Sequence, residues 1–135
     1  MRMIVSMKKK LFRDGPYSDF FSQGVQVGNV LTLAGQLGTD SDGNTPEDMK
    51  SQVEICYENI KSILAEFGAS TDNIIDETWF VTDMDECMEN VADIFGAREA
   101  VFGRKPEVSQ TLIGVSALVT PVNKVEIKCV AHLEL

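Results

Sequence analysis

The sequence is poor in the residues that build metal centres and membrane spans. It holds one histidine, His132, and an odd number of cysteines whose spacing matches no metal-ligand pattern. No segment approaches the ~20 consecutive apolar residues that a membrane helix needs. We therefore predict a protein with no metal site, no cofactor and no membrane partner. Its three cysteines are expected to be reduced thiols in the core: Cys56, Cys87 and Cys129.

Positive charge is also scarce. Twelve Lys and Arg residues stand against 21 Asp and Glu residues, which gives a net charge of −9. An acidic protein repels phosphate backbones, so general nucleic-acid binding is disfavoured. The first six residues, Met1–Ser6, are too short and too weakly apolar for a signal peptide, which indicates a cytoplasmic protein. Met7 is an alternative start of translation.

The length of 135 residues is typical of one domain, residues 1–135, with residues 1–8 as a flexible or extended N-terminal segment. Runs of apolar and β-branched residues predict strands, and Gly28-Asn29 predicts a tight hairpin turn between the second and third of them. The predicted strands of this part are Lys9–Arg13, Phe20–Val27, Val30–Ala34 and, after a helix, Asn73–Thr82.

Two helices follow from end signals and apolar stripes. The first is predicted to begin with Thr45 as its cap and Pro46 in its first turn, and to end at Gly68. The second is predicted to run from Asp83, with Glu86 as its capping-box partner, to Gly103.

The last thirty residues contain two apolar runs, Val108–Val119 and Lys124–Leu133, on either side of a turn, Thr120–Asn123. In the second run, apolar residues such as Val125 and Ile127 alternate with polar ones. Alternation with a period of two indicates a strand with two different faces. We therefore predict that the two runs form a hairpin.

The predicted order is β-β-β-α-β-α-β-β, an α+β two-layer sandwich with a mixed sheet and two helices on one face. The run Val108–Val119 carries apolar groups on both faces. Two helices cover only one face of such a sheet, so the other face is expected to be buried against further copies of the chain.

Six segments together resemble the Rid (YjgF) family of reactive intermediate deaminases, which is also described as the L-PSP endoribonucleases. They are Gly15–Ser18, Ser22–Asn29, Ala34–Gln36, the helix Gln52–Gly68, Val81–Met84 and Val125–Ala131. The resemblance implies a chorismate-mutase-like fold and a homotrimer with the sheets packed inward around the threefold axis. It also implies small-molecule sites in the clefts between subunits.

Deaminating members of that family hydrolyse an enamine or imine such as 2-aminoacrylate, and an arginine in a Pro-Ala-Arg-Ser-like motif holds the substrate carboxylate. Alignment on the strand after that motif puts Gln110 in the arginine's place, and alignment on Pro106 puts Val108 there. Arg104 precedes the motif and would need a loop rearrangement to reach the site. Glutamine offers hydrogen bonds but no charge, so 2-aminoacrylate is not the expected substrate.

The resemblance carries other site residues over. Glu126 matches the family's C-terminal glutamate and, with Gln110, is the predicted catalytic pair. The predicted substrate-binding residues are Gly35 and Gln36 at a strand end, Leu112 in place of a cysteine, and an aromatic ring. Tyr17 or Phe21 supplies that ring, because Asp19–Phe21 looks inserted before Ser22.

Two functions from different classes follow. The first is hydrolysis of an imine, enamine or related C–N bond in a substrate other than 2-aminoacrylate, with Glu126 orienting water. The alternative is a non-catalytic trimer that binds a small metabolite. A ribonuclease is the weakest interpretation, because the chain is acidic and has neither a histidine pair nor a carboxylate cluster for a metal.

Overall fold

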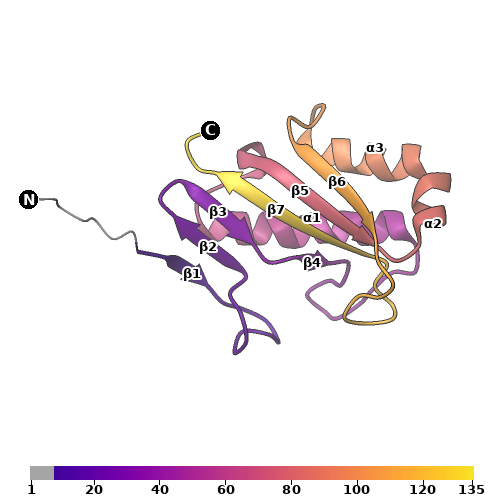
Figure 1. The fold of residues 1–135 in the computed structure, drawn as a ribbon, viewed down its shortest axis with the longest axis horizontal. Coiled ribbons are helices and arrows are strands. Elements are labelled where there is room, and N and C mark those ends of the chain that lie inside the picture. The colour runs from indigo at the N-terminus through magenta and orange to yellow at the C-terminus, as the bar shows by residue number, and fades with distance from the viewer. Residues whose placement is uncertain (1–7) are drawn as a thin grey trace, which may run out of the picture.

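A computed structural model describes residues 8–135. The alternative start at Met7 and residues 1–7 of the expected N-terminal segment lie outside the described residues. The chain forms strands β1 (Lys10–Phe12), β2 (Gly24–Val27), β3 (Val30–Leu33) and β4 (Gln36–Leu37), then helix α1 (Met49–Glu66), a 3-10 turn (Thr71–Asn73) and β5 (Ile74–Val81). Helices α2 (Met84–Glu89) and α3 (Val91–Phe102) and strands β6 (Ser109–Gly114) and β7 (Val125–His132) complete it (Figure 1).

The strands form one mixed sheet in the order β1-β2-β3-β7-β5-β6, with β4 also paired to β7. The β5–β6 pair is parallel and the other pairs are antiparallel. The helices lie behind this sheet, with α1 passing behind its central strands (Figure 1). The predicted α+β two-layer architecture is therefore confirmed, with the helices on one face.

The predicted C-terminal hairpin is wrong. β6 ends at Gly114 and pairs in parallel with β5, while β7 pairs with the other edge of β5 in the antiparallel sense. β5 thus lies between the two strands that the sequence pattern joined. A parallel pair needs a long crossover, and α2 and α3 supply it between β5 and β6. The alternation of residues identifies a strand but does not identify its neighbour.

The helix ends are partly as predicted. The cap of α1 is Asp48, three residues after the predicted Thr45, and it accepts a hydrogen bond from the Ser51 N–H (2.9 Å). That bond and one from the Ser51 hydroxyl lower the pKa of the Asp48 carboxyl. Gly68, at φ +70°, follows its last residues as predicted.

The second helix has the predicted ends but is divided in its middle. Asp83 accepts a hydrogen bond from the Glu86 N–H (2.9 Å), and Gly103, at φ +73°, ends α3. Asn90 separates α2 from α3, so the single predicted helix is two. The capping box is half formed, because the Glu86 carboxylate accepts from the Met49 N–H and the Lys124 ammonium instead.

The hydrophobic core lies between the helices and the covered face of the sheet. Alternate residues of β5 and β7 point into it, among them Trp79, which is fully buried and stacks on Phe95 of α3 at 4.9 Å between ring centroids. The three cysteines are buried and unpaired, as the sequence predicts. Within residues 8–135 we find no helix with the length and apolarity to cross a membrane.

We call the opposite side of the sheet, which the helices of residues 8–135 leave uncovered, the open face. On β7 it carries residues that alternate with the core set and are partly or fully exposed: Glu126, Lys128, Val130 and His132. Large apolar side chains are exposed on its strands, including Val30 and Ile113. This face therefore combines two charged groups near its centre with apolar surroundings.

Candidate functional site

Glu126 lies on the open face of β7, in register with Leu37 of β4 and Phe80 of β5. The side chain is half-buried, yet no donor among residues 8–135 forms a hydrogen bond with its carboxylate. Burial raises the pKa of this carboxyl above its ordinary value, and the positive charge of Lys128 partly opposes that shift. A carboxylate with a raised pKa and unused acceptor oxygens can take a proton from water.

Gly35 lies directly against that carboxylate. A Cβ atom built on Gly35 would be 2.6 Å from Oε2 of Glu126, closer than such contacts occur. The backbone of Gly35 does not have a positive φ, so its glycine is required by close approach and not by conformation. The structure therefore brings these two sequence-predicted site residues together.

Gln36 follows Gly35 but faces the other way. It pairs with Ile127, whereas Leu37 pairs with Glu126, and only 9% of Gln36 is exposed. Its Nε2 donates to Oε1 of Gln23 (2.8 Å) and to the Ala34 carbonyl (3.0 Å). The Gln36 amide thus fixes the chain segment on which Gly35 lies.

Tyr17 and Phe21, the two candidates for one aromatic position, stack on each other in the loop between β1 and β2. Their ring centroids are 5.6 Å apart and their planes differ by 16°. Both rings are partly exposed, and the neighbouring Phe20 is 79% exposed. Within residues 8–135, hydrogen bonds do not join this loop to Glu126. The structure therefore presents both rings on one surface, and which of them meets a substrate stays a prediction.

Gln110 and Leu112 lie on β6 with their side chains on the helix-covered face. The Nε2 of Gln110 donates to Oε1 of Glu77 (3.2 Å), and Leu112 packs against the core in register with Trp79. Because Glu126 projects from the opposite face, a single chain does not bring it together with Gln110.

Glu77 is the centre of a buried polar cluster that the sequence analysis missed. This carboxylate is fully buried and accepts from the Tyr57 hydroxyl (2.7 Å) and from Nε of Arg98 (2.5 Å), as well as from Gln110. One signal was available in the sequence. Glu77, Trp79 and Val81 are two residues apart on β5 and so share one face, and all three are buried. Charge on the apolar side of a strand indicates a buried partner.

The other arginines of the described chain have partners of their own. Arg104 forms ion pairs with Asp72 (3.2 Å) and Glu107 (3.7 Å), and Arg13 donates to the Ser18 carbonyl (2.8 Å). The cation nearest in sequence to Glu126 on the open face is Lys128, which the sequence analysis did not single out. Lys128 lies two residues after Glu126 in a strand, which places both side chains on the same face, and this spacing could have revealed it.

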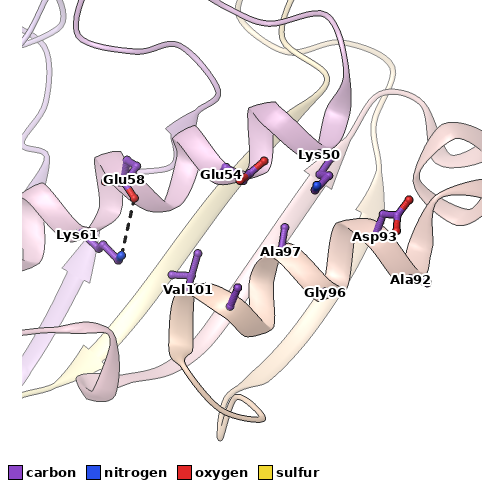
Figure 2. Close-up of a pocket in the computed structure, with 10 residues that line it drawn as sticks. Lys50, Glu54, Glu58, Lys61, Ala92, Asp93, Gly96, Ala97 and Val101 are labelled. Atoms are coloured by element: carbon purple, nitrogen blue, oxygen red, sulfur yellow. Dashed lines mark ion pairs between the residues drawn. The ribbon is translucent and has the colours of Figure 1, made fainter.

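A separate groove of about 570 Å³ runs between α1 and α3 on the outer side of the helical layer (Figure 2). Charged residues of α1, including the Glu58–Lys61 ion pair, line one wall, and small residues of α3 such as Gly96 and Ala97 line the other. The groove contains none of the predicted site residues. Among residues 8–135, three or more His, Cys, Asp or Glu side chains are nowhere grouped to hold a metal ion.

Comparison with known proteins assigns the chain to a family. Residues 15–133 match the family model described as Endoribonuclease L-PSP. The RutC family protein YjgH of Escherichia coli is 33% identical over 98 residues, which cover 73% of this chain and 72% of YjgH. The protein described as putative reactive intermediate deaminase TdcF, also of Escherichia coli, is 31% identical over 87 residues, 64% of each chain.

The fold agrees with solved structures of this group. The crystal structure of RidA from an Antarctic Psychrobacter species superposes with a TM-score of 0.75 at 27% identity and covers 90% of this chain and 93% of RidA. Sequence and structure thus agree over nearly the whole described chain, which belongs to the endoribonuclease L-PSP family, the Rid or YjgF family that its motifs resemble.

Proposed function

We propose that this protein hydrolyses an imine, an enamine or a related C–N bond in a small-molecule substrate other than 2-aminoacrylate. The observation that carries the proposal is Glu126, a half-buried carboxylate that receives no hydrogen bond from residues 8–135 and lies against Gly35 on the open face. The family relative described as a reactive intermediate deaminase supports this class of reaction. Glu126 is the proposed catalytic residue.

The chemistry needs water and a base. Glu126 accepts a proton from water while the water oxygen forms a bond to the imine carbon and the C=N electron pair moves to nitrogen. The same carboxyl then gives that proton to nitrogen. Glu126 next takes the hydroxyl proton of this carbinolamine and passes it to nitrogen as the C–N bond breaks, so ammonia or an amine leaves and the carbonyl product remains. An enamine with an N–H group first takes a proton on carbon and loses one from nitrogen to become the imine.

The site is proposed to be completed between subunits of a homotrimer. The exposed apolar side chains of the open face, such as Val30 and Ile113, require cover, and further copies of the chain can supply it. In that arrangement the Tyr17–Phe21 ring pair is an aromatic wall for a substrate. Gly35, on the segment that the Gln36 amide fixes, shapes the cleft beside Glu126. The proposed setting is the cytoplasm, with no nucleic acid as partner because the net charge is −9.

The test compares Glu126→Gln with wild type on purified imines with and without a carboxylate. We expect kcat/KM to fall by about 10²- to 10⁴-fold, the usual contribution of a general base. Glu54→Gln, an exposed carboxylate in the α1–α3 groove, is the matched control and should keep full activity. Equal activity of Glu126→Gln and wild type would remove Glu126 from the mechanism.

The pH profile gives a second check. Only the ionised carboxylate accepts a proton, so kcat/KM should rise with pH through a pKa above the ordinary glutamate value of 4.5. The raised pKa also means that ionising Glu126 costs more in the folded than in the unfolded state. Glu126→Gln should therefore gain stability relative to wild type as the pH rises above about 4.5, and not below it.

A second candidate is a non-catalytic trimer that binds a small metabolite. It is favoured by the position of Gln110, the residue aligned with the family arginine, whose amide is engaged by the buried Glu77. This candidate would be supported by a ligand that co-purifies with the protein, binds at the open face and is released without chemical change. Turnover of any imine that depends on Glu126 would exclude it.

A further inference from the structure

His132 is the last residue of β7, lies on the open face, and is the only histidine in the sequence. It is in register with Val30 of β3, and Val130 precedes it by two residues on the same side of β7. Ile75 of β5 lies next to this pair, where the pairing of β5 with β7 is irregular. Val30 and Ile75 are exposed and the imidazole is half-buried. A titratable ring thus lies among apolar side chains that a single chain leaves uncovered.

The hydrogen bonds at His132 are those of a neutral ring on a fixed backbone. Its Nδ1 accepts from the Glu134 N–H (3.4 Å), which the charged ring could not do because both of its nitrogens are donors. The buried Asn73 donates from Nδ2 to the His132 carbonyl (3.1 Å). The Leu133 N–H donates to the Asn29 carbonyl (2.8 Å). The strand end that carries the imidazole is therefore held in place.

The ionisable groups near the imidazole are mostly acidic and lie at its edge. The Glu134 carboxylate accepts from Nδ2 of Asn29 (2.6 Å). The Asp76 carboxylate, on the β5 residue opposite Val130, accepts from a serine hydroxyl of β6 (2.6 Å). The other ionisable groups on the elements around the ring are Asp72, which pairs with Arg104, the terminal carboxyl group of Leu135, and Glu126 and Lys128 further back on β7. Acidic groups favour the protonated imidazole in a separate chain, whereas apolar cover favours the neutral one.

We propose that His132 makes the assembly of this chain with copies of itself depend on pH: the open faces pack together when the imidazole is neutral and separate when it is protonated. This inference rests on the homotrimer of the proposed function. Glu126 and Lys128 give the centre of the face charges of both signs, so copies of the same face do not repel each other. The exposed Val30 and Ile75 supply apolar contact, among which a charged imidazole costs more to bury than a neutral one.

Assembly then releases protons, and this fixes the direction of the pH effect. An imidazole changes charge at about pH 6.5, so the trimer is fully stable above that pH and weakens as the pH falls through it. Three imidazoles stay neutral in each trimer. The association constant should therefore fall by up to about 1000-fold for each further unit of pH, until the assembled rings also take up protons.

The first measurement is sedimentation equilibrium of the chain without a histidine tag, from about pH 8 to about pH 5.5, with circular dichroism to show that the subunits stay folded. We expect a trimer at the higher pH and reversible dissociation at the lower one. His132→Gln is polar but never charged and should remain a trimer throughout. His132→Lys carries a charge at every pH of the series and should associate less than wild type at about pH 8. Lys61→Gln, a surface change on α1, is the control and should follow wild type.

The second measurement uses the fact that the chain has a single histidine, so the imidazole proton signals in an NMR spectrum report His132 alone. Because assembly favours the neutral ring, a higher protein concentration should move the midpoint of this titration to lower pH. A histidine that only packs in the structure of one chain would titrate at the same pH at every concentration, and that result would contradict the proposal.

An association constant that is the same at about pH 8 and about pH 5.5 would overturn the role of His132 and leave the homotrimer standing. Dissociation of His132→Gln with the pH dependence of wild type would also overturn it, and would indicate Glu126, whose carboxyl has a raised pKa on the same face. A monomer at every pH and concentration would instead contradict the homotrimer itself, so the two failures are distinguishable.

Discussion

Two glutamates on paired strands of the sheet have opposite surroundings. Glu77 of β5 faces the helices, is fully buried, and accepts hydrogen bonds from Tyr57, Arg98 and Gln110. Glu126 of β7 faces the open side, is half-buried, and accepts none from residues 8–135.

The difference separates a structural carboxylate from one available for chemistry. Donors on α1, α3 and β6 converge on Glu77, so this carboxylate ties the helical layer to the sheet and offers no free oxygen to a substrate. Burial also raises the pKa of Tyr57 beyond its ordinary range, so its hydroxyl stays protonated and donates to Glu77. Burial removes water from Glu126, and the described residues donate no hydrogen bond in its place, which is the combination expected at a site that binds another molecule.

The largest expected effect is on the buried carboxylate. Glu77→Ala leaves the Arg98 guanidinium, whose side chain is 11% exposed, without its partner, and breaking a buried pair in this way costs about 3–5 kcal/mol of folding free energy. Glu126→Ala should change the free energy of unfolding by less than about 1 kcal/mol, because it removes no bond. Urea unfolding at one fixed protein concentration measures both. Similar losses for the two variants would contradict the contrast.

The next largest effect tests whether the position of Glu126 matters for the reaction. In Gly35→Ala the new methyl group would overlap Oε2 of Glu126, so the carboxylate must move. A displacement of about 1 Å at a reacting group can cost about 100-fold in rate, and we expect kcat/KM to fall by about that factor.

A glycine elsewhere provides the control for that substitution. A Cβ on Gly96 meets no atom within 4 Å, and Gly96→Ala should leave activity unchanged and stabilise α3 by up to about 1 kcal/mol. If Gly35→Ala hydrolyses imines as fast as wild type, the position of Glu126 against the backbone has no part in the reaction.

The smallest effect concerns Gln110. Gln110→Leu removes one of three donors to Glu77 and should cost about 1 kcal/mol in the free energy of unfolding. Gln110→Arg should not accelerate hydrolysis of 2-aminoacrylate, because the side chain faces Glu77 and not Glu126. A gain of that activity in Gln110→Arg would instead support the alignment that places this position in the substrate cleft.

Much of the local structure could be predicted from the sequence because its causes are local. Gly103 ends α3 in the left-handed conformation, Asp83 caps α2, and the alternation around Glu126 separates core from surface along β7. Gly28 allows the tight turn between β2 and β3, where Val27 and Val30 pair as expected.

The candidate site was less predictable because it depends on which face the helices cover. Glu126 and Gln110 lie on strands whose alternation is clear, but alternation alone does not say whether two strands present the same side. That depends on strand order and register, since a shift of one residue exchanges the two faces. The family resemblance therefore predicted Gln110 and Glu126 as a catalytic pair, whereas within one chain the Gln110 amide bonds to Glu77.

The sequence by itself determined most of the strands, most helix ends, the α+β class and the family of this chain, but not the short strand β4 or the start of β2 at Gly24. Only the tertiary structure decided that β5 lies between β6 and β7, that Arg98 and Gln110 serve the buried Glu77, and that Lys128 shares a surface with Glu126. The physical reason is the distance along the chain over which each interaction acts. Backbone conformation and alternation depend on near neighbours in the chain, while strand order and charge partners depend on packing between segments that are distant in sequence.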